Sequence, residues 1–325
     1  MKFTKTMCAL VIAALVSVSG VAQAEWKPSK NIDAIVHTGP GGGNDVLARA
    51  IAQMLEKEKL LPVRMNVINK PGGNGAVAAA AIFDKKGDPH TIGLISTNWL
   101  ANALTTSEAK ITLHDLTPVV GLMTEPAVIV VRADSPYKTL KDFLDAAKAK
   151  PGTLKQSGGS VTARDNIVRQ ALQAKTGGKW VFVSFPGGGE RIAALLGGHV
   201  DMMVIEPQEA GEQVRSGKMR VLAQIAAKPL AGYPGIPTMK EAGYDIPLIP
   251  QIRAIMGPPE MSKDVLAYYE DLFARLRKTA SWKKYIEDNQ FEDSYTTSAE
   301  LDKWIKQLET DMRTQFQAIG IKTVR

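Results

Sequence analysis

The sequence predicts an α/β protein of two domains, and three observations lead to that prediction. Short runs of β-branched apolar residues alternate with amphipathic helical segments along most of the chain, an order typical of parallel strands joined by helical crossovers. Two longer β-rich tracts, PVVGLMTEPAVIVVRAD and MRVLAQIAA, flank a second set of such units. The length of 325 residues is enough for two medium domains.

The chain begins with the pattern of a secretory signal peptide. Two lysines in MKFTKT precede the apolar run MCALVIAALVSVSGVA, and the small-residue sequence AQA stands before Glu25. We therefore expect residues 1–24 to be cleaved after Ala24 and the mature protein to be exported. The one cysteine, Cys8, lies in this segment, so the mature chain has no disulfide and no thiol chemistry.

After the signal segment, three strands and two helices are expected to open the first domain. Strands are predicted at residues 32–38, 64–70 and 91–97, and helices at 44–58 and 74–85. The first β-rich tract then carries the chain into the second domain, and the second tract brings it back near Leu222–Ala227. Two crossing strands would form a hinge over a cleft.

The helical C-terminal third is expected to complete the first domain, with Ser262 and Ser298 as N-caps of two of its helices. Domain 1 is therefore predicted to comprise residues 25–124 and 228–325, and domain 2 residues 125–227. The formal net charge of +7 is spread over helix faces of mixed sign. Because no basic tract is interleaved with aromatic residues, nucleic acid is not an expected partner.

Glycine-rich turns stand directly before three predicted helices. GPGGGND precedes the helix of residues 44–58, and QSGGSVTARDNIV and SFPGGGERIAALL repeat the order of strand, small residues and helix in the second domain. Ligands of open α/β sheets bind at the carboxyl ends of the strands, and the free N–H groups of a helix start attract anions. Three such loops facing one cleft predict a ligand with more than one acidic group.

Neither phosphate-binding fingerprint fits the first loop. A P-loop needs Gly-Lys-Ser/Thr at the helix start, and here Gly43 is followed by Asn44 and Asp45. A dinucleotide fold needs a third glycine where Val46 stands. The loop is therefore interpreted as an anion site of another kind.

Catalysis has little support in the sequence. The four histidines are scattered without metal-ligand spacing. No Gly-x-Ser-x-Gly elbow is present, and no histidine is placed to activate Ser157 or Ser160. We therefore expect no enzyme activity, no cofactor and no metal.

The chain resembles the Bug-type periplasmic solute receptors of tripartite tricarboxylate transporters. The resemblance rests on PGGGNDVLARAIAQML, NKPGGNGAVAAAAI, AKAKPGTL, ALLGGHVDMMV, SGKMRVLAQ and YPGIPTMKEAGYD, in the family's order from about Trp26 to Gly320. It implies a class II periplasmic-binding-protein fold, a periplasmic location and a monomer that works with integral-membrane permease subunits. In such receptors a small carboxylate ligand binds between the domains, which close by hinge motion.

The resemblance also implies which residues bind the ligand. The main-chain N–H groups of the first glycine loop usually hold the ligand's carboxyl group, partly through ordered waters. The other segments that the resemblance assigns to the site are the loop after the third strand, SVTAR and PGGGE. The residues expected from these four segments are Gly42, Gly43, Asn44, Thr97, Asn98, Ser160, Thr162 and Gly188.

Charged residues mark departures from the family pattern. Arg164 stands where a small hydroxyl residue is common; it is expected to bind a ligand carboxylate, or else to pair with Asp165 or another acid. Glu206 would orient Arg164 or accept from a ligand hydroxyl or amine, and Arg253 is a second candidate cation. Arg191 is expected at the surface. Together these residues favour a dicarboxylate or an aromatic acid.

Two other functions stay open at this stage. The same binding module would serve as the ligand sensor of a membrane receptor. An exported hydrolase would use a glycine loop as an oxyanion hole, although it would need an activated nucleophile. The leading hypothesis is a non-enzymatic receptor that delivers an organic acid to a permease.

Overall fold

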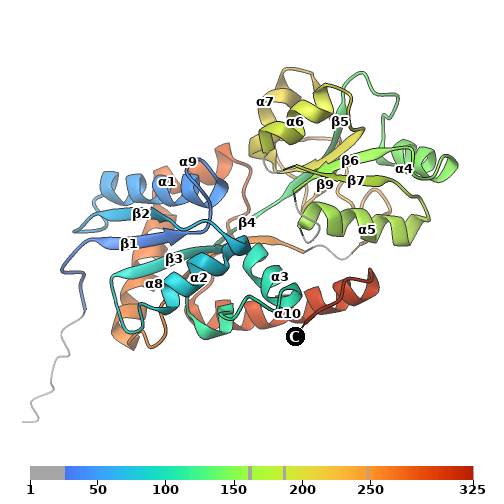
Figure 1. The fold of residues 1–325 in the computed structure, drawn as a ribbon. Helices are drawn as coiled ribbons and strands as arrows, with labels where there is room; N and C mark the ends of the chain where they lie inside the picture. The colour runs from blue at the N-terminus through green and yellow to red at the C-terminus, as the bar shows by residue number, and fades with distance from the viewer. Residues whose placement is uncertain (1–25, 160–162, 186–187, 247–248, 325) are drawn as a thin grey trace, which may run out of the picture.

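Two α/β lobes make up the protein (Figure 1). The computed structural model describes residues 26–159, 163–185, 188–246 and 249–324, and the predicted signal segment lies outside these ranges. Each lobe is built on a five-stranded sheet. The strands of the first sheet, in spatial order, are β2 (Met65–Asn69), β1 (Ile32–Val36), β3 (Thr91–Ser96), β10 (Gln251–Gly257) and β4 (Thr117–Glu125).

The first sheet is parallel where the sequence predicts it and antiparallel at its other edge. Strand β1 pairs in parallel with β2 and β3, whereas β10 runs antiparallel to both β3 and β4. The predicted strands and helices at the start of the chain are confirmed within a few residues at each end. Parallel order therefore ends where the crossing strands enter the sheet.

Helices cover both faces of the first sheet and include the C-terminal helices, as predicted. One face packs against α1 (Gly43–Lys57), α8 (Lys263–Lys278) and α9 (Ala280–Asp288), through residues such as Ile51, Phe273 and Trp282. The other packs against α2 (Ala76–Phe83), α3 (Thr97–Thr105) and α10 (Ser298–Ala318). None of the helices in the described part of the chain is long and apolar enough to cross a membrane.

The second lobe has the same three-layer plan. Its sheet has the order β7 (Val181–Ser184), β6 (Lys155–Gly158), β8 (Met202–Ile205), β5 (Ala127–Arg132) and β9 (Met219–Ile225). Helices α4 (Leu140–Ala149) and α5 (Arg164–Thr176) pack on one face. Helices α6 (Gly188–Leu196) and α7 (Pro207–Arg215) pack on the other.

The chain crosses between the lobes at two places. Pro126 alone separates β4 in the first sheet from β5 in the second. The return lies later than the predicted Leu222–Ala227, because β9 stays paired with β5 up to Ile225. Beyond it, Met239 and Ile246 are buried in the second core, and the chain rejoins the first sheet with β10. We therefore propose that domain 2 extends from residue 127 to 246.

One of the two predicted N-caps is confirmed and the other is off by one residue. The hydroxyl of Ser262 accepts the N–H of Val265 at 3.4 Å at the start of α8. At α10 the N-cap is Thr297, whose N–H donates to the carboxylate of Glu300 at 2.8 Å. Ser298 is already inside that helix, where its hydroxyl donates to the carbonyl of Pro118.

Candidate functional site

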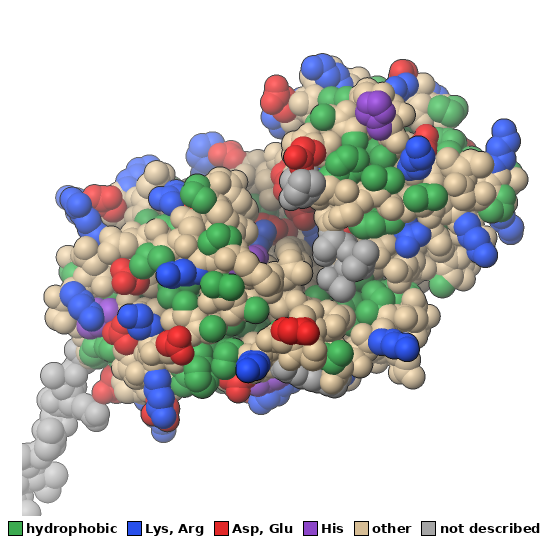
Figure 2. Space-filling view, in the orientation of Figure 1, with side chains coloured by type: hydrophobic (Ala, Val, Ile, Leu, Met, Phe, Trp, Pro, Cys, Tyr) green, Lys and Arg blue, Asp and Glu red, His purple; other side chains and the backbone are tan. Residues whose placement is uncertain are grey.

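A cavity of about 530 Å³ lies between the two lobes, and Figure 2 shows the hollow with acidic and basic side chains inside it. Both lobes contribute walls, which come largely from the ends of strands and the starts of helices. The predicted ligand-binding residues that line it are Gly43, Asn44, Asn98, Arg164, Gly188, Glu206 and Arg253.

The other predicted residues have different places. Gly42 is the N-cap of α1. Thr97 holds the start of α3 against the strand β10, because its hydroxyl donates to the carbonyl of Pro250 at 2.6 Å and accepts the N–H of Ile252 at 2.9 Å. Ser160 and Thr162 lie outside the described residues.

The first glycine loop leaves two N–H groups at the cavity. Gly41 adopts a φ of 81°, which favours glycine, and its N–H donates to the carboxylate of Asp45 at 2.8 Å. Thr38 accepts the N–H of Asp45. Gly43 and Asn44 are the two residues before Asp45, in the first turn of α1. Their N–H groups have no acceptor within the helix. These two groups lie at the positive end of the helix dipole and are therefore donors that an anion in the cavity could use.

Helix starts at the cavity lack side-chain caps. At α1, α2, α3, α5 and α7 the N-cap residue makes no side-chain hydrogen bond, and each of these helices has a cavity-lining residue at or next to its start. The N-cap of α6 lies outside the described residues. By contrast, side chains close the starts of α4, α8, α9 and α10, none of which reaches the cavity in the described part of the chain. The cleft thus collects the helix starts whose donors are not used by the protein's own caps.

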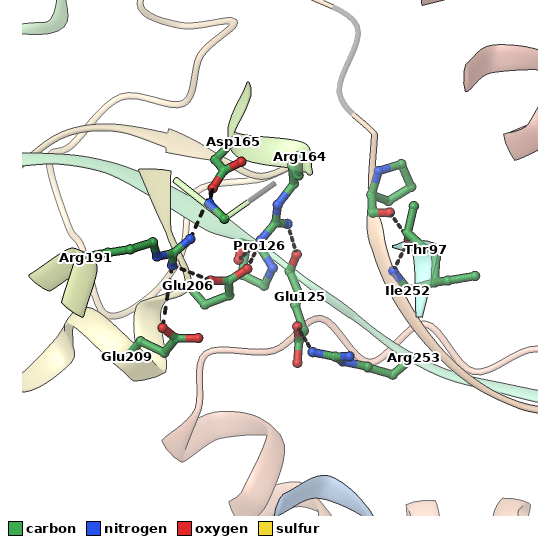
Figure 3. Close-up of polar contacts among 12 residues, drawn as sticks. Thr97, Glu125, Pro126, Arg164, Asp165, Arg191, Glu206, Glu209, Ile252 and Arg253 are labelled. Atoms are coloured by element: carbon green, nitrogen blue, oxygen red, sulfur yellow. Dashed lines mark hydrogen bonds and ion pairs between the residues drawn. The ribbon is translucent and has the colours of Figure 1, made fainter. Parts of the chain in front are cut away.

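Arg253 lies beside the start of α1, and Figure 3 shows it paired with Glu125. Its Nη2 is 2.6 Å from Glu125 Oε2, its Nη1 donates to Asn44 Oδ1, and its Nε has no partner among the described residues. Burial lowers the pKa of Arg253, but Glu125 outweighs that effect and the net pKa is raised. The guanidinium is therefore charged at the point where the uncapped helix would receive an anion.

Arg164 connects three elements at the crossing between the lobes. Its Nη2 donates to Glu206 Oε1 at 2.7 Å, and its Nη1 donates to the carbonyl of Glu125 at 2.6 Å (Figure 3). Burial raises the pKa of Glu206, but Arg164 and Arg191 outweigh it and the net pKa is lowered. Glu206 thus holds Arg164 in place, which is one of the two roles expected for it.

The expected surface position of Arg191 is wrong. Its side chain is 11% exposed and lines the cavity, where Nη1 lies 3.1 Å from Asp165 Oδ2. Its Nη2 lies 3.6 Å from Glu209 Oε2. Arg191 stands in the first turn of α6, which begins at the cleft, so a position that sequence periodicity assigns to a helix surface faces the cavity and the starts of α5 and α7.

Comparison with known proteins decides the family. Residues 47–321 match the family model described as "Tripartite tricarboxylate transporter family receptor". The chain belongs to this receptor family. Relatives of this receptor include the UPF0065 protein in the gbd 5′ region of Cupriavidus necator, 26% identical over 94% of this chain and 93% of the relative. BugT of Bordetella pertussis is 28% identical over 76% of this chain and 77% of BugT.

Solved structures share the receptor's fold. A TctC solute binding protein from Polaromonas superposes with a TM-score of 0.71 and 27% identity over 89% of this chain and 99% of that protein. R. palustris Rpa4515 with adipate has a TM-score of 0.82 at 19% identity, over 91% and 99%. MatC from Rhodopseudomonas palustris with bound malate has a TM-score of 0.75 at 21% identity, over 90% and 99%. The predicted periplasmic-binding-protein fold is confirmed.

His37 is a cavity residue of the receptor that sequence reasoning missed. Burial, followed by the charge of Arg253, lowers its pKa to about 4, so the ring is neutral at pH 7. Its Nδ1 lies 2.9 Å from Trp99 Nε1 and 3.0 Å from Asn44 Nδ2, both donors. The ring proton is therefore on Nε2, as a donor. Trp99 itself is buried in the core.

Possible metal ligands and Ser157 can be placed among the described residues of the receptor. The described residues contain no group of three or more His, Cys, Asp or Glu that would hold a metal ion. The hydroxyl of Ser157 is buried and has no partner among them. His37 belongs to the other lobe and is held by Trp99 and Asn44. Ser157 is therefore not activated by the one cavity-lining histidine in this part of the chain.

Proposed function

We propose that the protein captures a small organic acid with two carboxyl groups between its lobes, closes over it by hinge motion and delivers it to membrane permease subunits. The observation that carries the proposal is the group of uncapped helix starts at one cavity. Membership of the tripartite tricarboxylate transporter receptor family supports the transport role.

The first carboxyl group is assigned to the first glycine loop. The N–H groups of Gly43 and Asn44 donate to it, and Arg253 adds a positive charge from β10. A carboxylate there would accept from Arg253 Nε, which otherwise remains a buried donor without a partner. Asn98 and His37 line the same wall and supply neutral donors. On this wall an anion would be held by the charge of Arg253 and by several neutral hydrogen-bond donors.

The second carboxyl group is assigned to the opposite wall, near Arg164 and Arg191. Proteins of the same fold have been solved with adipate and malate, both dicarboxylates, which supports an acid of this class. An aromatic acid is the variant of this proposal. The described cavity lining includes the phenyl ring of Phe185, and an acid with an aromatic ring would stack on it.

The proposed setting is the periplasm, where the protein acts as a monomer after removal of residues 1–24. The signal-like sequence and the family of periplasmic receptors support this setting. A sensor that presents the closed form to a membrane receptor would use the same cleft. Recovery of permease subunits with ligand-loaded protein from membranes supports transport, whereas recovery of a signalling receptor alone would favour the sensor.

Thermal unfolding of the mature chain against mono-, di-, tri- and aromatic carboxylates tests the proposal. A ligand that binds the folded form at about a hundred times its Kd adds roughly 2.7 kcal/mol to the free energy of unfolding. We expect a dicarboxylate to raise Tm most. Neutral sugars and amines of similar size serve as controls. A Tm rise with these controls and none with any acid would contradict the proposal, once native mass spectrometry has excluded a co-purified ligand.

A further inference from the structure

The wall contributed by the second lobe has more acids than cations. Arg164 and Arg191 face three carboxylates there, namely those of Asp165, Glu206 and Glu209 (Figure 3). The third arginine of the described cavity lining, Arg253, is already paired with Glu125. An incoming dianion therefore meets a wall whose cations all have partners within the protein.

Glu209 is the least tightly held of these acids. Asp165 is 5% exposed and accepts the N–H groups of Gly159 and Asn166, each at 2.7 Å. Glu206 pairs with Arg164 at 2.7 Å. The side chain of Glu209 is 41% exposed, and among the described residues its carboxylate makes one longer contact, of 3.6 Å, with Arg191. It is therefore the acid that can leave its position at the smallest cost.

The position of Glu209 is the one that a second ligand carboxylate needs. Its Oε2 lies against Gly188, the first residue of α6, because a methyl group added there would be 2.2 Å from that oxygen. The carboxylate of Glu209 therefore lies between Arg191 and the start of α6. Arg191 and Gly188, the first residue of α6, both line the cavity. The carboxylate of Glu209 thus occupies the position that the second carboxylate of a diacid would take.

We propose that Glu209 is a specificity-determining residue of this cleft: its carboxylate occupies the anion position formed by Arg191 and the start of α6, and a diacid binds there after Glu209 has taken up a proton and left that position. The inference rests on the proposed function and names the part of the ligand that Glu209 controls. An acid with one carboxyl group, bound at α1, leaves Glu209 undisturbed.

Binding of a diacid is then linked to proton uptake. Glu209 faces Arg191 on α6, Glu206 at the start of α7, Glu125 on β4 and Arg253 on β10. Burial and the charge of Glu206 raise the pKa of Glu209 to about 7, against the opposing effect of Arg191. A ligand carboxylate nearby raises that pKa further. The affinity for a diacid should rise as pH falls from 9 to 7, by up to tenfold per pH unit, and level off below 7.

Calorimetric titration with adipate and malate between pH 6 and 9, in buffers of different ionisation enthalpy, tests the inference. Wild type should take up close to one proton per diacid at pH 7.5–8.5. Glu209→Gln should remove the pH dependence and bind the diacid about tenfold tighter at pH 8.5. Glu212→Gln, an exposed position on the same helix, should behave as wild type. Tm values of both variants establish that they are folded.

The outcomes separate this inference from the proposed function. Diacid binding with equal pH dependence in wild type and Glu209→Gln leaves the proposed function standing and overturns the role of Glu209. Weaker binding by Glu209→Gln also overturns it, since Glu209 would then be a direct partner of the ligand. If neither protein binds any acid of the carboxylate panel, the proposed function fails and the inference fails with it.

Discussion

The helix starts at the cleft and those on the outer surface follow opposite rules. On the outside, α4 begins at Thr139, whose hydroxyl accepts the N–H of Asp142 at 3.2 Å, and α8 begins with the cap of Ser262. At the cleft, α1 begins after Gly42 and α5 after Ala163, neither of which has a side chain that can accept. A side-chain cap contributes about 1 kcal/mol. The starts of α1 and α5 therefore lack the stability that an N-cap side chain gives the outer helices, and they retain donors that a ligand can use.

The largest expected effect concerns the charge beside the uncapped start of α1. Glu125→Ala leaves Arg253 buried without its carboxylate partner, next to the positive end of a helix. The free energy of unfolding should fall by about 3–5 kcal/mol, the range for removing one member of a buried ion pair. Urea unfolding of this variant and of the exposed Glu56→Ala measures the difference. A loss below about 1 kcal/mol would show that the first loop does not depend on this neutralisation.

A second effect concerns the acid that replaces a cap in the first loop. Asp45 accepts the N–H of Gly41, and its hydrogen bond to Arg49 is the main reason why its pKa is lowered to about 2. A lowered pKa stabilises the protein above the ordinary pKa of Asp near 4, and this contribution is lost as pH falls towards 2.

Asp45→Asn should therefore lower the free energy of unfolding by about 1–2 kcal/mol at pH 7, a range reduced because Arg49 is half exposed. The difference from wild type should disappear near pH 2. Urea unfolding at both pH values measures it, with the exposed Asp84→Asn as control. The same difference at pH 7 and pH 2 would rule out the ionised carboxylate as its cause.

The cap at the start of α4 should stabilise the protein without acting on the cleft. Thr139→Ala should lower the free energy of unfolding by about 1 kcal/mol, because the first turn of α4 loses its acceptor. Ligand affinity should stay unchanged, since α4 has no residue among the described cavity lining. Thermal unfolding and titration on the same sample give both quantities. A change in affinity would mean that outer caps also act on the cleft.

A cap added at a helix start of the cleft should change stability by the smallest amount of these substitutions. Ala163 has φ −76° and ψ 156°, the conformation of a normal N-cap. Ala163→Ser should raise the free energy of unfolding of the ligand-free protein by about 0.5–1 kcal/mol and weaken ligand binding several-fold. Unchanged affinity together with higher stability would show that the start of α5 donates nothing to the ligand.

Local patterns predicted the elements and the loops of the cleft, whereas the ion pairs depend on the tertiary fold. The alternation of apolar runs and the glycine turns are properties of neighbouring residues, so they place β1, α1 and the first loop correctly. Arg253 and Glu125 are 128 positions apart and meet across two adjacent strands. No spacing rule connects them, and the sequence therefore gives Arg253 as a cation without its partner.

The same limit explains the missed residues. Periodicity predicts a surface position for Arg191 because it describes a helix alone and not the neighbouring helix starts that pack around its first turn. His37 had one available signal, its position directly between β1 and the glycine loop, where side chains reach a cleft. The return crossing that we propose lies later than Leu222–Ala227, because the apolar pattern of residues 219–227 marks a strand without telling which sheet it joins.

The position of β10 between β3 and β4 also governs the order in which the two lobes can fold. The first sheet cannot be completed until residues 251–257 are available, although its first strand begins at Ile32. The second lobe needs only the continuous stretch from about residue 127 to 246. Closing a long loop costs chain entropy before its contacts form. We therefore expect the lobe in the middle of the sequence to fold first and to bring together the two segments that form the other lobe.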